Sequence, residues 1–297
     1  MKLSVFTVSM PEYDIEQSAL LLKKLGYNAV EWRVADVPEK FPENVPFEGR
    51  YWACNHSTLN VKDITNEAKR AKAACDAAGI KMLALTTYLP TNQYEKFDEV
   101  FAAAKETGCE FVRIGLAGFN PAKTDKTYPE AFDAMRADMK VIEGIAAKYG
   151  VKALNEIHMD SLISSPSAAY RALEGLDPAH IGLIYDPGNM VYEGYEDTLK
   201  SFQLLGKYIA HIHIKNGLLV KDGENEFGAA KYKRQWMPLD KGSADLYNVF
   251  CCAKKMGFDG YFSLEDFSNE DDTETKLAKA QAFVEKLYEA ADPEKAY

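Results

Sequence analysis

Four short segments in the second half of the chain end an apolar run with an acidic residue or a histidine. They are Glu156 and His158 in NEIH, Asp186 in YDPGN, His213 in HIHIKN and Glu265 in SLEDF. Three carboxylates brought together repel one another unless a cation neutralises them. Carboxylates with one imidazole suit a fairly hard divalent ion, so this pattern predicts Mn²⁺ or Mg²⁺, with Co²⁺ or Zn²⁺ as alternatives.

The segment HIHIKN places two of the five histidines two residues apart inside an apolar run. In a β-strand, alternate side chains share a face. His211, His213 and Lys215 then point one way, and Ile212 and Ile214 point the other. We expect the isoleucines to face covering helices and the polar side chains to face the interior of a barrel.

The elements that must position these residues alternate along the chain as short β-rich runs and longer helical patterns. The expected strands are 3–9, 29–35, 81–89, 111–117, 151–158, 181–189, 209–216 and 260–267, while 51–59 is ambiguous between a loop and a short extra strand. Eight strand–helix units in 297 residues, with no linker or break in composition, predict a single α/β domain over 1–297. Its expected fold is the closed (β/α)8 TIM barrel.

Several local signals mark the boundaries of the helices. Helical patterns stop repeatedly at a glycine before the next strand, and Ser165 precedes Pro166 as a helix start does. No Gly-rich phosphate loop follows the early strands, so a nucleotide-binding sheet is not indicated. In a TIM barrel the chemistry lies at the carboxyl ends of the strands, where the tips of the last four strands converge.

Composition excludes several classes of function. The net charge of −10 is spread along the chain without a basic stripe, which argues against a nucleic-acid partner. The chain has no run of 18 apolar residues, so no membrane span is expected. The odd number of cysteines, five, and the absence of a CxxC motif predict buried thiols in a reducing cytoplasm.

The sequence resembles the xylose isomerase-like TIM-barrel superfamily, in particular its sugar phosphate isomerase/epimerase branch, over essentially the whole chain. The segments that carry the resemblance are LNEIH, IYDPGNMVYEGYE, IAHIHIKN and MPLDKGSADLYNVFCCAKKMGFDGYFSLEDF. The resemblance implies a metal held by Glu156, Asp186, His213 and Glu265. It leaves His211 deeper in the barrel as a supporting or packing residue.

The chemistry that the resemblance implies is proton removal from carbon next to a carbonyl, through a metal-stabilised enediolate. Glu156 and Glu265 are then the expected acid/base pair, and His158 is either a further base or a hydrogen-bonded histidine at the rim. The leading hypothesis is an isomerase or epimerase of a sugar or keto-sugar. The alternative is a lyase that cleaves C- or O-linked 3-oxo-glycosides by enolisation and β-elimination.

A third hypothesis, from a different class, is a sugar-binding or scaffolding barrel without catalysis, against which the complete ligand set argues. The expected partner is a small carbohydrate, and the sequence leaves open a homo-oligomer or a complex with a small subunit.

The chain departs from the family pattern at two positions. Asn189 stands where relatives often carry histidine, and Asn216 stands where many carry aspartate. Neither change removes a metal ligand. Both leave the substrate and the route of the proton open.

The candidate substrate-binding residues are Asn189, Lys215, Trp236 and His56. Lys215 either contacts a substrate oxygen or phosphate, or pairs with a ligand carboxylate. Trp236 either stacks on a sugar or anchors the long segment 217–242, which is expected to form an active-site lid.

For three charged side chains on the early strands, two roles are open. Glu31, Arg33 and Arg113 either form ion pairs inside the barrel or contact the substrate.

Overall fold

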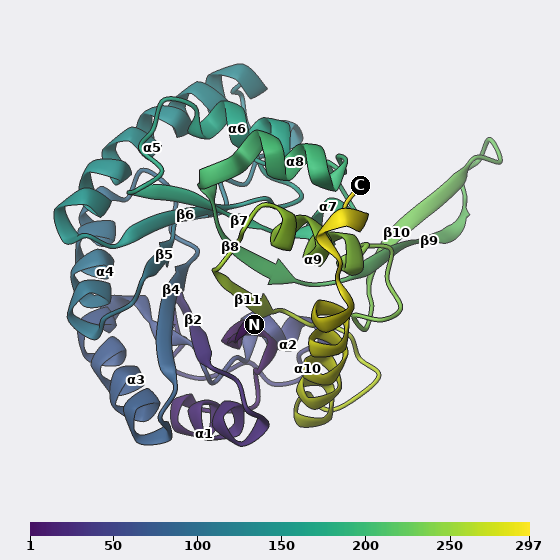
Figure 1. Cartoon of the computed structure of the whole chain (residues 1–297). Coiled ribbons are helices and arrows are strands. Elements are labelled where there is room, and N and C mark those ends of the chain that lie inside the picture. Colours follow the sequence, from purple (N-terminus) through teal and green to yellow (C-terminus); the bar gives the residue numbers. More distant parts are fainter.

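Eight parallel strands close into a ring in the computed structural model, which describes residues 1–297 (Figure 1). The strands are β1 (Lys2–Phe6), β2 (Ala29–Ala35), β4 (Lys81–Thr87), β5 (Phe111–Arg113), β6 (Lys152–Glu156), β7 (Ile181–Tyr185), β8 (Ile209–Ile214) and β11 (Tyr261–Leu264). Strand β1 pairs with both β2 and β11, which closes the sheet. The predicted (β/α)8 barrel is therefore confirmed, and every expected barrel strand is present.

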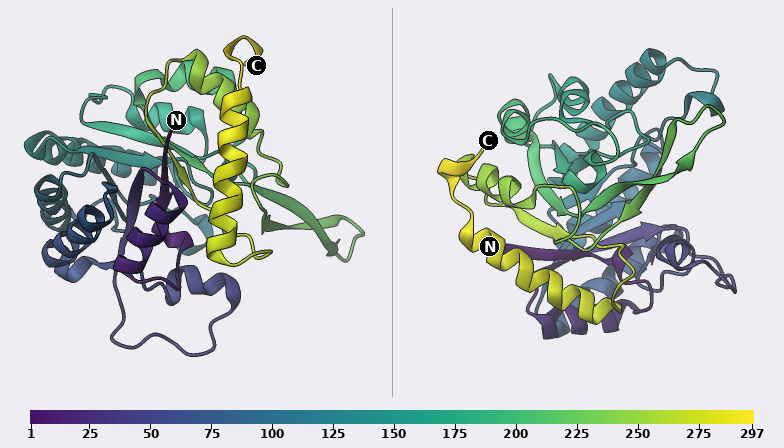
Figure 2. Two further views of the ribbon diagram at one scale, coloured as in Figure 1. Left: turned by 60° about the horizontal axis from the view of Figure 1, so that its bottom comes forward. Right: turned by 90° about the vertical axis from the view of Figure 1, so that its right-hand side faces the viewer.

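Helices cover the outside of the ring in Figures 1 and 2. They are α1 (Ile15–Leu25), α3 (Ile64–Ala78), α4 (Tyr94–Thr107), α5 (Tyr128–Tyr149), α6 (Pro166–Leu173), α8 (Thr198–Leu205), α9 (Leu246–Lys255) and α10 (Thr273–Ala290). Helix α1 ends at Gly26 with φ of +88°, a left-handed conformation that glycine adopts without steric cost. At the start of α6, the Ser165 side chain accepts a hydrogen bond from the Ala168 amide at 3.2 Å, which confirms the predicted cap.

The segment 51–59, for which a loop and a short extra strand were the alternatives, contains part of a short helix as well as a short strand. Its first residues belong to a short helix, α2 (Arg50–Ala53), and only its end forms a strand, β3 (Leu59–Asn60). Strand β3 pairs in parallel with the last two residues of β2, Val34 and Ala35. A second short helix that was not expected, α7 (Pro187–Met190), follows β7, and the Asp186 side chain accepts from the Asn189 amide to cap it.

The long segment after β8 is an antiparallel hairpin instead of an irregular loop. Strands β9 (Gly217–Glu224) and β10 (Ala230–Trp236) pair with each other alone and project away from the barrel in all the ribbon views. Phe227 at its tip is 85% exposed. The prediction of a lid is therefore wrong for most of the segment, and only the base of the hairpin lies near the barrel mouth.

Two layers of side chains fill the inside of the barrel. The lower layer is apolar and contains Ala29, Leu154 and Ile184. Two residues further along the same strands stand Glu31, Glu156 and Asp186, so the strand period places an acidic layer directly above the apolar one. The buried acidic residues therefore lie toward the carboxyl end of the barrel.

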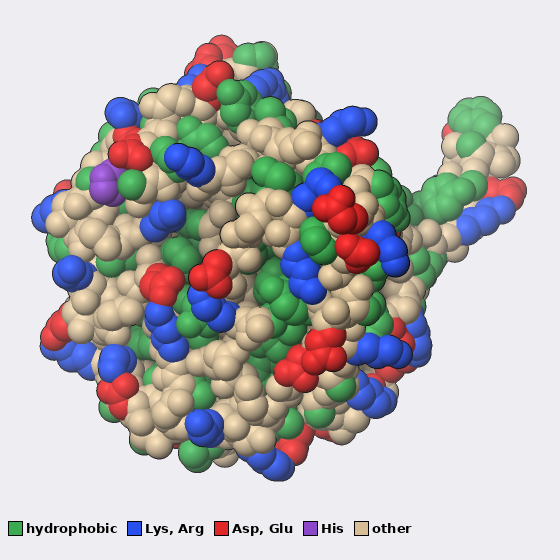
Figure 3. Space-filling model, viewed as in Figure 1, with side chains coloured by type: hydrophobic (Ala, Val, Ile, Leu, Met, Phe, Trp, Pro, Cys, Tyr) green, Lys and Arg blue, Asp and Glu red, His purple; other side chains and the backbone are tan.

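The outer surface is mixed in charge. On the face shown in Figure 3, acidic and basic side chains are interspersed. None of the helices combines the length and the apolar character that crossing a bilayer requires.

Candidate metal centre

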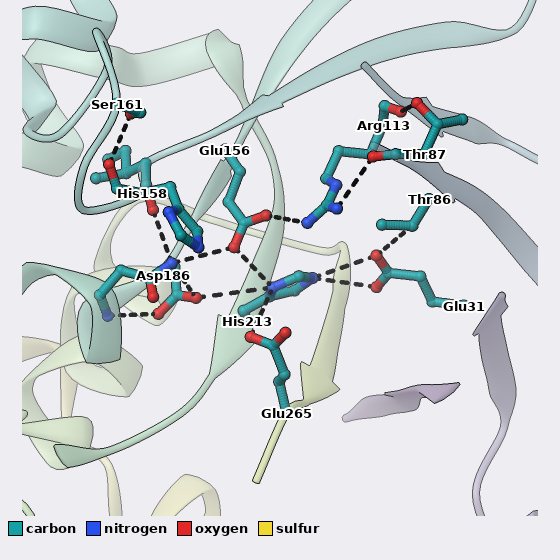
Figure 4. Close-up of polar contacts among 12 residues, drawn as sticks. Glu31, Thr86, Thr87, Arg113, Glu156, His158, Ser161, Asp186, His213 and Glu265 are labelled. Atoms are coloured by element: carbon teal, nitrogen blue, oxygen red, sulfur yellow. Dashed lines mark hydrogen bonds and ion pairs between the residues drawn. The ribbon is translucent and has the colours of Figure 1, made fainter. Parts of the chain in front are cut away.

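The four predicted ligands meet at one point. Glu156, Asp186, His213 and Glu265 stand at the carboxyl ends of β6, β7, β8 and β11, and their potential ligand atoms all lie within 4.8 Å of one another (Figure 4). All four are buried, with exposed fractions of 1%, 0%, 0% and 4%. The alternation read from HIHIKN accounts for this geometry, because it turns the His213 ring into the barrel.

The Nδ1 atom of His213 lies at the centre of the group. It is 3.5 Å from Glu156 Oε1, 3.8 Å from Asp186 Oδ2 and 3.7 Å from Glu265 Oε2, yet it forms no hydrogen bond. Ligand atoms about 2.1 Å from a tetrahedral ion stand about 3.4 Å from one another. The spacing and the unpartnered nitrogen both fit a metal ion held between these four side chains.

Glu31 supports His213 from the opposite side of the ring. Its carboxylate oxygen Oε2 lies 3.1 Å from His213 Nε2 and 3.0 Å from His211 Nε2, and its Oε1 accepts from Thr86 Oγ1 at 2.5 Å. Burial alone would raise the pKa of Glu31, but the two histidines hold it well below its usual range. A proton on Nε2 of His213 leaves Nδ1 as a lone pair for a metal.

The supporting role predicted for His211 is consistent with this contact. Thr86 was missed by sequence reasoning, although its alternation along β4 places it in the lumen with Glu31.

Arg113 neutralises one ligand. Its guanidinium forms a buried ion pair with Glu156 and donates to the Thr87 carbonyl at 3.0 Å. Although burial opposes it, this contact holds the pKa of Glu156 well below its usual range. Arg33, by contrast, forms no ion pair and donates instead to Thr58 Oγ1 and the Trp52 carbonyl.

Lys215 pairs with two other ligands. Its ammonium lies 3.0 Å from Asp186 Oδ2 and forms a close ion pair with Glu265. It is 2% exposed and lies 5.0 Å from the ring centre of Trp236. Despite burial, Asp186 and Glu265 raise its pKa above the usual value. The structure thus shows the ion pair that was one of the two alternatives for this residue.

The connected group of buried charges carries an excess of negative charge. Its carboxylates are Glu31, Glu156, Asp186 and Glu265, and its permanent cations are Arg113 and Lys215. With His213 neutral and Glu265 ionised, as metal ligands are, four carboxylates exceed two cations by two charges, which is the charge of a divalent ion. Uncompensated buried charge is costly, so the excess favours a divalent cation at this centre.

Asn189 links the ligands to one another. Its amide nitrogen lies 3.1 Å from Glu156 Oε1, 2.8 Å from Asp186 Oδ2 and 3.1 Å from the Ile157 carbonyl. Its amide oxygen accepts from Lys215 Nζ at 3.0 Å. The side chain predicted to contact substrate is therefore fully engaged in positioning the ligands.

His158 follows Glu156 at the rim of the cluster. Its Nδ1 lies 2.6 Å from the Met159 carbonyl, and because a carbonyl only accepts, Nδ1 carries the proton. Burial lowers the pKa of His158, so the ring is neutral at pH 7 and Nε2 has a free lone pair. Figure 4 shows His158 beside Glu156 and Asp186, where it can act as a base.

The remaining candidates lie further from the ligands. Trp236 packs against Tyr192 and Phe267, with ring centres 4.8 Å and 5.5 Å away, and so anchors the hairpin base over Lys215. Asn216 donates to the Leu239 carbonyl at 2.8 Å and fixes the chain where it returns from the hairpin. His56 is exposed, and its ring packs on Phe41 at 4.4 Å, so the structure does not bring it to the cluster.

Comparison with known proteins identifies relatives along nearly the whole chain. The family model described as xylose isomerase-like TIM barrel matches residues 20–287. An inosose dehydratase of Geobacillus thermodenitrificans is 23% identical over 271 residues, which cover 82% of this chain and 89% of the relative.

Solved structures share the fold. The 3-keto-D-glucoside 4-epimerase of E. coli has a TM-score of 0.69 at 14% identity, covering 96% of this chain and 99% of that protein. The IOLI protein with a bound zinc atom has a TM-score of 0.66 at 18% identity, covering 98% and 99%. From the matched family model, this chain belongs to the xylose isomerase-like TIM barrel family.

Proposed function

We propose that this chain is a divalent-metal-dependent enzyme that removes a proton from carbon next to the carbonyl of a keto-sugar or of a related cyclic polyhydroxy ketone. The observation that carries the proposal is the buried cluster of three carboxylates and one imidazole, which together with Glu31, Arg113 and Lys215 has an excess of negative charge that matches a divalent ion. An ion held by Glu156, Asp186, His213 and Glu265 supplies a Lewis acid for the substrate carbonyl. Mn²⁺ is our first choice for that ion, and the zinc-bound IOLI structure supports a divalent metal in general.

The side chains suited to moving the proton are Glu265 and His158. In the metal-free protein burial raises the pKa of Glu265 to about 7, so this carboxylate takes up a proton more readily than Glu156, whose pKa lies well below its usual range. His158 offers the free Nε2 described above. Glu156 is less suited, because Arg113 and Asn189 engage both of its oxygens.

The first outcome of proton removal is isomerisation or epimerisation. It requires the proton to return to the other face of the same carbon or to the neighbouring carbon. Two separate acid/base groups, Glu265 and His158, permit this return. The epimerases among the structurally similar proteins support this outcome.

The second outcome is β-elimination, and the sequence relatives named inosose dehydratase favour it. Here the electron pair left by the proton forms a carbon–carbon double bond, while the group on the next carbon departs and takes up a proton. The leaving group is water in a dehydratase and an alcohol or a carbon-linked aglycone in a 3-oxo-glycoside lyase. Glu265 or His158, once protonated, can donate to the departing group.

Incubation in D₂O with Mn²⁺ and a panel of an inosose, a ketohexose and a 3-keto-glucoside tests the proposal. Deuterium next to the carbonyl of an isomeric product supports epimerisation, and an unsaturated or aglycone product supports elimination. Protein stripped of metal and the variant Glu265→Gln serve as controls and are expected to lose at least a hundredfold in rate. Absence of exchange with every member of the panel contradicts the proposed function and favours a binding protein.

We also propose a cytoplasmic location, which the five unpaired cysteines support. A homo-oligomer or a complex with a small subunit is a further proposal, which size-exclusion chromatography with light scattering tests.

A further inference from the structure

A cavity opens at the same end of the barrel as the metal centre. It has a volume of about 400 Å³ and lies between the segments that follow β4, β5 and β6 and the first turns of α5. Eight of its fourteen lining residues are hydrophobic, among them Tyr88, Leu89, Leu116, Met135 and Leu162. The volume and the apolar lining are those of a small-molecule site.

Tyr88 connects this cavity to the metal centre. Its ring lines the cavity, and the Arg113 guanidinium lies 4.7 Å from the centre of that ring. Arg113 in turn pairs with Glu156, a metal-binding residue. One tyrosine and one arginine therefore separate the cavity from the metal ligands.

The walls of the cavity are preformed. The Ala117 carbonyl accepts from the Leu162 amide at 3.0 Å, and Gly118 bridges to Ser161, so the two segments support each other. The Tyr128 hydroxyl donates to the Leu162 carbonyl at 3.0 Å. A rigid wall avoids the entropy cost of ordering a loop on binding.

The main acidic group of the lining is already satisfied. Asp138 accepts hydrogen bonds from Thr91 Oγ1 at 2.6 Å and from the Tyr94 hydroxyl. Lys126, the other charged residue of the lining, is exposed, so an apolar ligand can pack on the hydrophobic residues while the ammonium stays in water. Aromatic and aliphatic side chains form most of the remaining lining, which Thr91, Asn92 and Lys126 complete.

We infer that this cavity is a subsite for an apolar, ring-sized substituent of the substrate, attached to the carbonyl-bearing part that lies at the metal centre. The inference rests on the proposed function and adds the substrate class: a sugar or cyclic polyol that bears a hydrophobic ring. Burying such a ring is expected to strengthen binding at least tenfold over a methyl group.

Titration calorimetry with phenyl β-D-glucoside and methyl β-D-glucoside tests the subsite on the Mn²⁺-loaded protein. Neither probe has a ketone, so binding is measured without turnover. We expect the phenyl compound to bind at least tenfold more tightly. Equal affinity, or no binding of either probe, overturns the inference.

Matched variants on α5 locate the contact. Ala134 is exposed and lines the cavity, and a tryptophan there covers the preceding turn and fills the mouth. Ala134→Trp should abolish the preference for the phenyl compound and leave the affinity for the methyl compound unchanged. Ala147→Trp is the control, because Ala147 is equally exposed on the same helix, about 20 Å further along its axis. Retention of the preference in Ala134→Trp overturns the inference.

A second variant tests the chemistry of the wall. Leu116→Gln places an amide in the cavity and should lower the preference severalfold, and thermal unfolding confirms that each variant folds. These outcomes are independent of turnover. Failure of the proposed function appears as absence of deuterium exchange with every keto-sugar, while failure of the subsite appears as loss of discrimination between the two glucosides.

Discussion

Glu31 and His213 face each other across the barrel lumen, with Glu31 Oε2 3.1 Å from His213 Nε2. The two residues are 182 positions apart in the chain. This contact fixes the ring orientation that turns Nδ1 toward the three carboxylates. A residue outside the proposed ligand set therefore determines which nitrogen faces the three carboxylates.

Replacing Glu31 by glutamine should weaken the binding of Mn²⁺ about 10- to 100-fold. The amide keeps the shape of the side chain, but it cannot accept from both histidines and Thr86 with the strength of a carboxylate. Titration calorimetry measures the change, and Glu39→Gln, an exposed glutamate in the loop after β2, is the control. Unchanged affinity in Glu31→Gln would show that the ligands alone orient His213.

Metal binding should weaken as the pH falls. In the metal-free protein, Glu31, Asp186 and Glu156 hold the pKa of His213 well above its usual value in spite of burial, and burial raises that of Glu265 to about 7. Protons on these groups must leave before the metal binds, so the dissociation constant should rise about tenfold per pH unit for each proton displaced. Calorimetry from pH 8 to pH 6 measures the slope.

Glu265→Gln supplies the control for that slope. Because glutamine carries no titrating proton, the slope should fall by about one proton per ion bound. An affinity independent of pH would contradict the raised pKa values.

Gly188→Ala should disrupt the metal centre by displacing the backbone of α7. A Cβ atom there would lie 2.7 Å from the backbone carbon, Cβ and Cγ of Lys215, so α7 would have to shift away from β8 and carry Asp186 with it. We expect a loss of about 1–3 kcal/mol in the free energy of unfolding, together with weaker metal binding. Urea unfolding with and without Mn²⁺ measures both effects.

Gly144 provides the matched comparison. It lies in α5 with open space around it, so Gly144→Ala should stabilise the helix by about 0.5–1 kcal/mol and leave metal binding unchanged. If both variants behave alike, the close approach at Gly188 does not constrain the fold.

One cysteine should react rapidly with a thiol reagent in the folded protein. Cys54 is half-buried, whereas the other four cysteines are buried, and burial raises the pKa of Cys75 to about 11 and that of Cys109 to about 12. Dithionitrobenzoate should therefore titrate about one thiol before denaturation and five after it. Cys54→Ser should abolish the fast phase, and persistence of that phase would place the reactive thiol elsewhere.

Much of the barrel was predictable because its signals are local. Strand periods, the glycines that end helices and the acidic residues at strand ends each depend on a few neighbouring residues, such as Asp186 in YDPGN. The positions of the four ligands followed from that regularity and from the resemblance. Their convergence required only that the barrel closes.

The partners of charged side chains were not predictable in the same way. Arg33 and Arg113 both stand on barrel strands, yet only Arg113 reaches a carboxylate, because Glu156 lies on the neighbouring strand β6. The Arg33 guanidinium is instead directed to Thr58 and Trp52 in the segment after β2. The hairpin was missed because GLLVKDGE lacks a clear alternation of apolar and polar residues, and because both strands are mostly exposed and so need no continuous apolar face. The exposure of His56 depends on the path of an irregular loop, which no local period determines.

The metal centre draws on the two halves of the chain for different purposes. Glu156, Asp186, His213 and Glu265 come from the second half, whereas Glu31, Thr86 and Arg113, which support them, come from the first. Because synthesis runs from the N-terminus, the supporting residues are made first, and the ligand set is complete only once Glu265, after the last strand β11, has been added. Closure of the barrel by pairing of β11 with β1 therefore also brings the last ligand to the supporting residues, so the same step that completes the ring completes the centre.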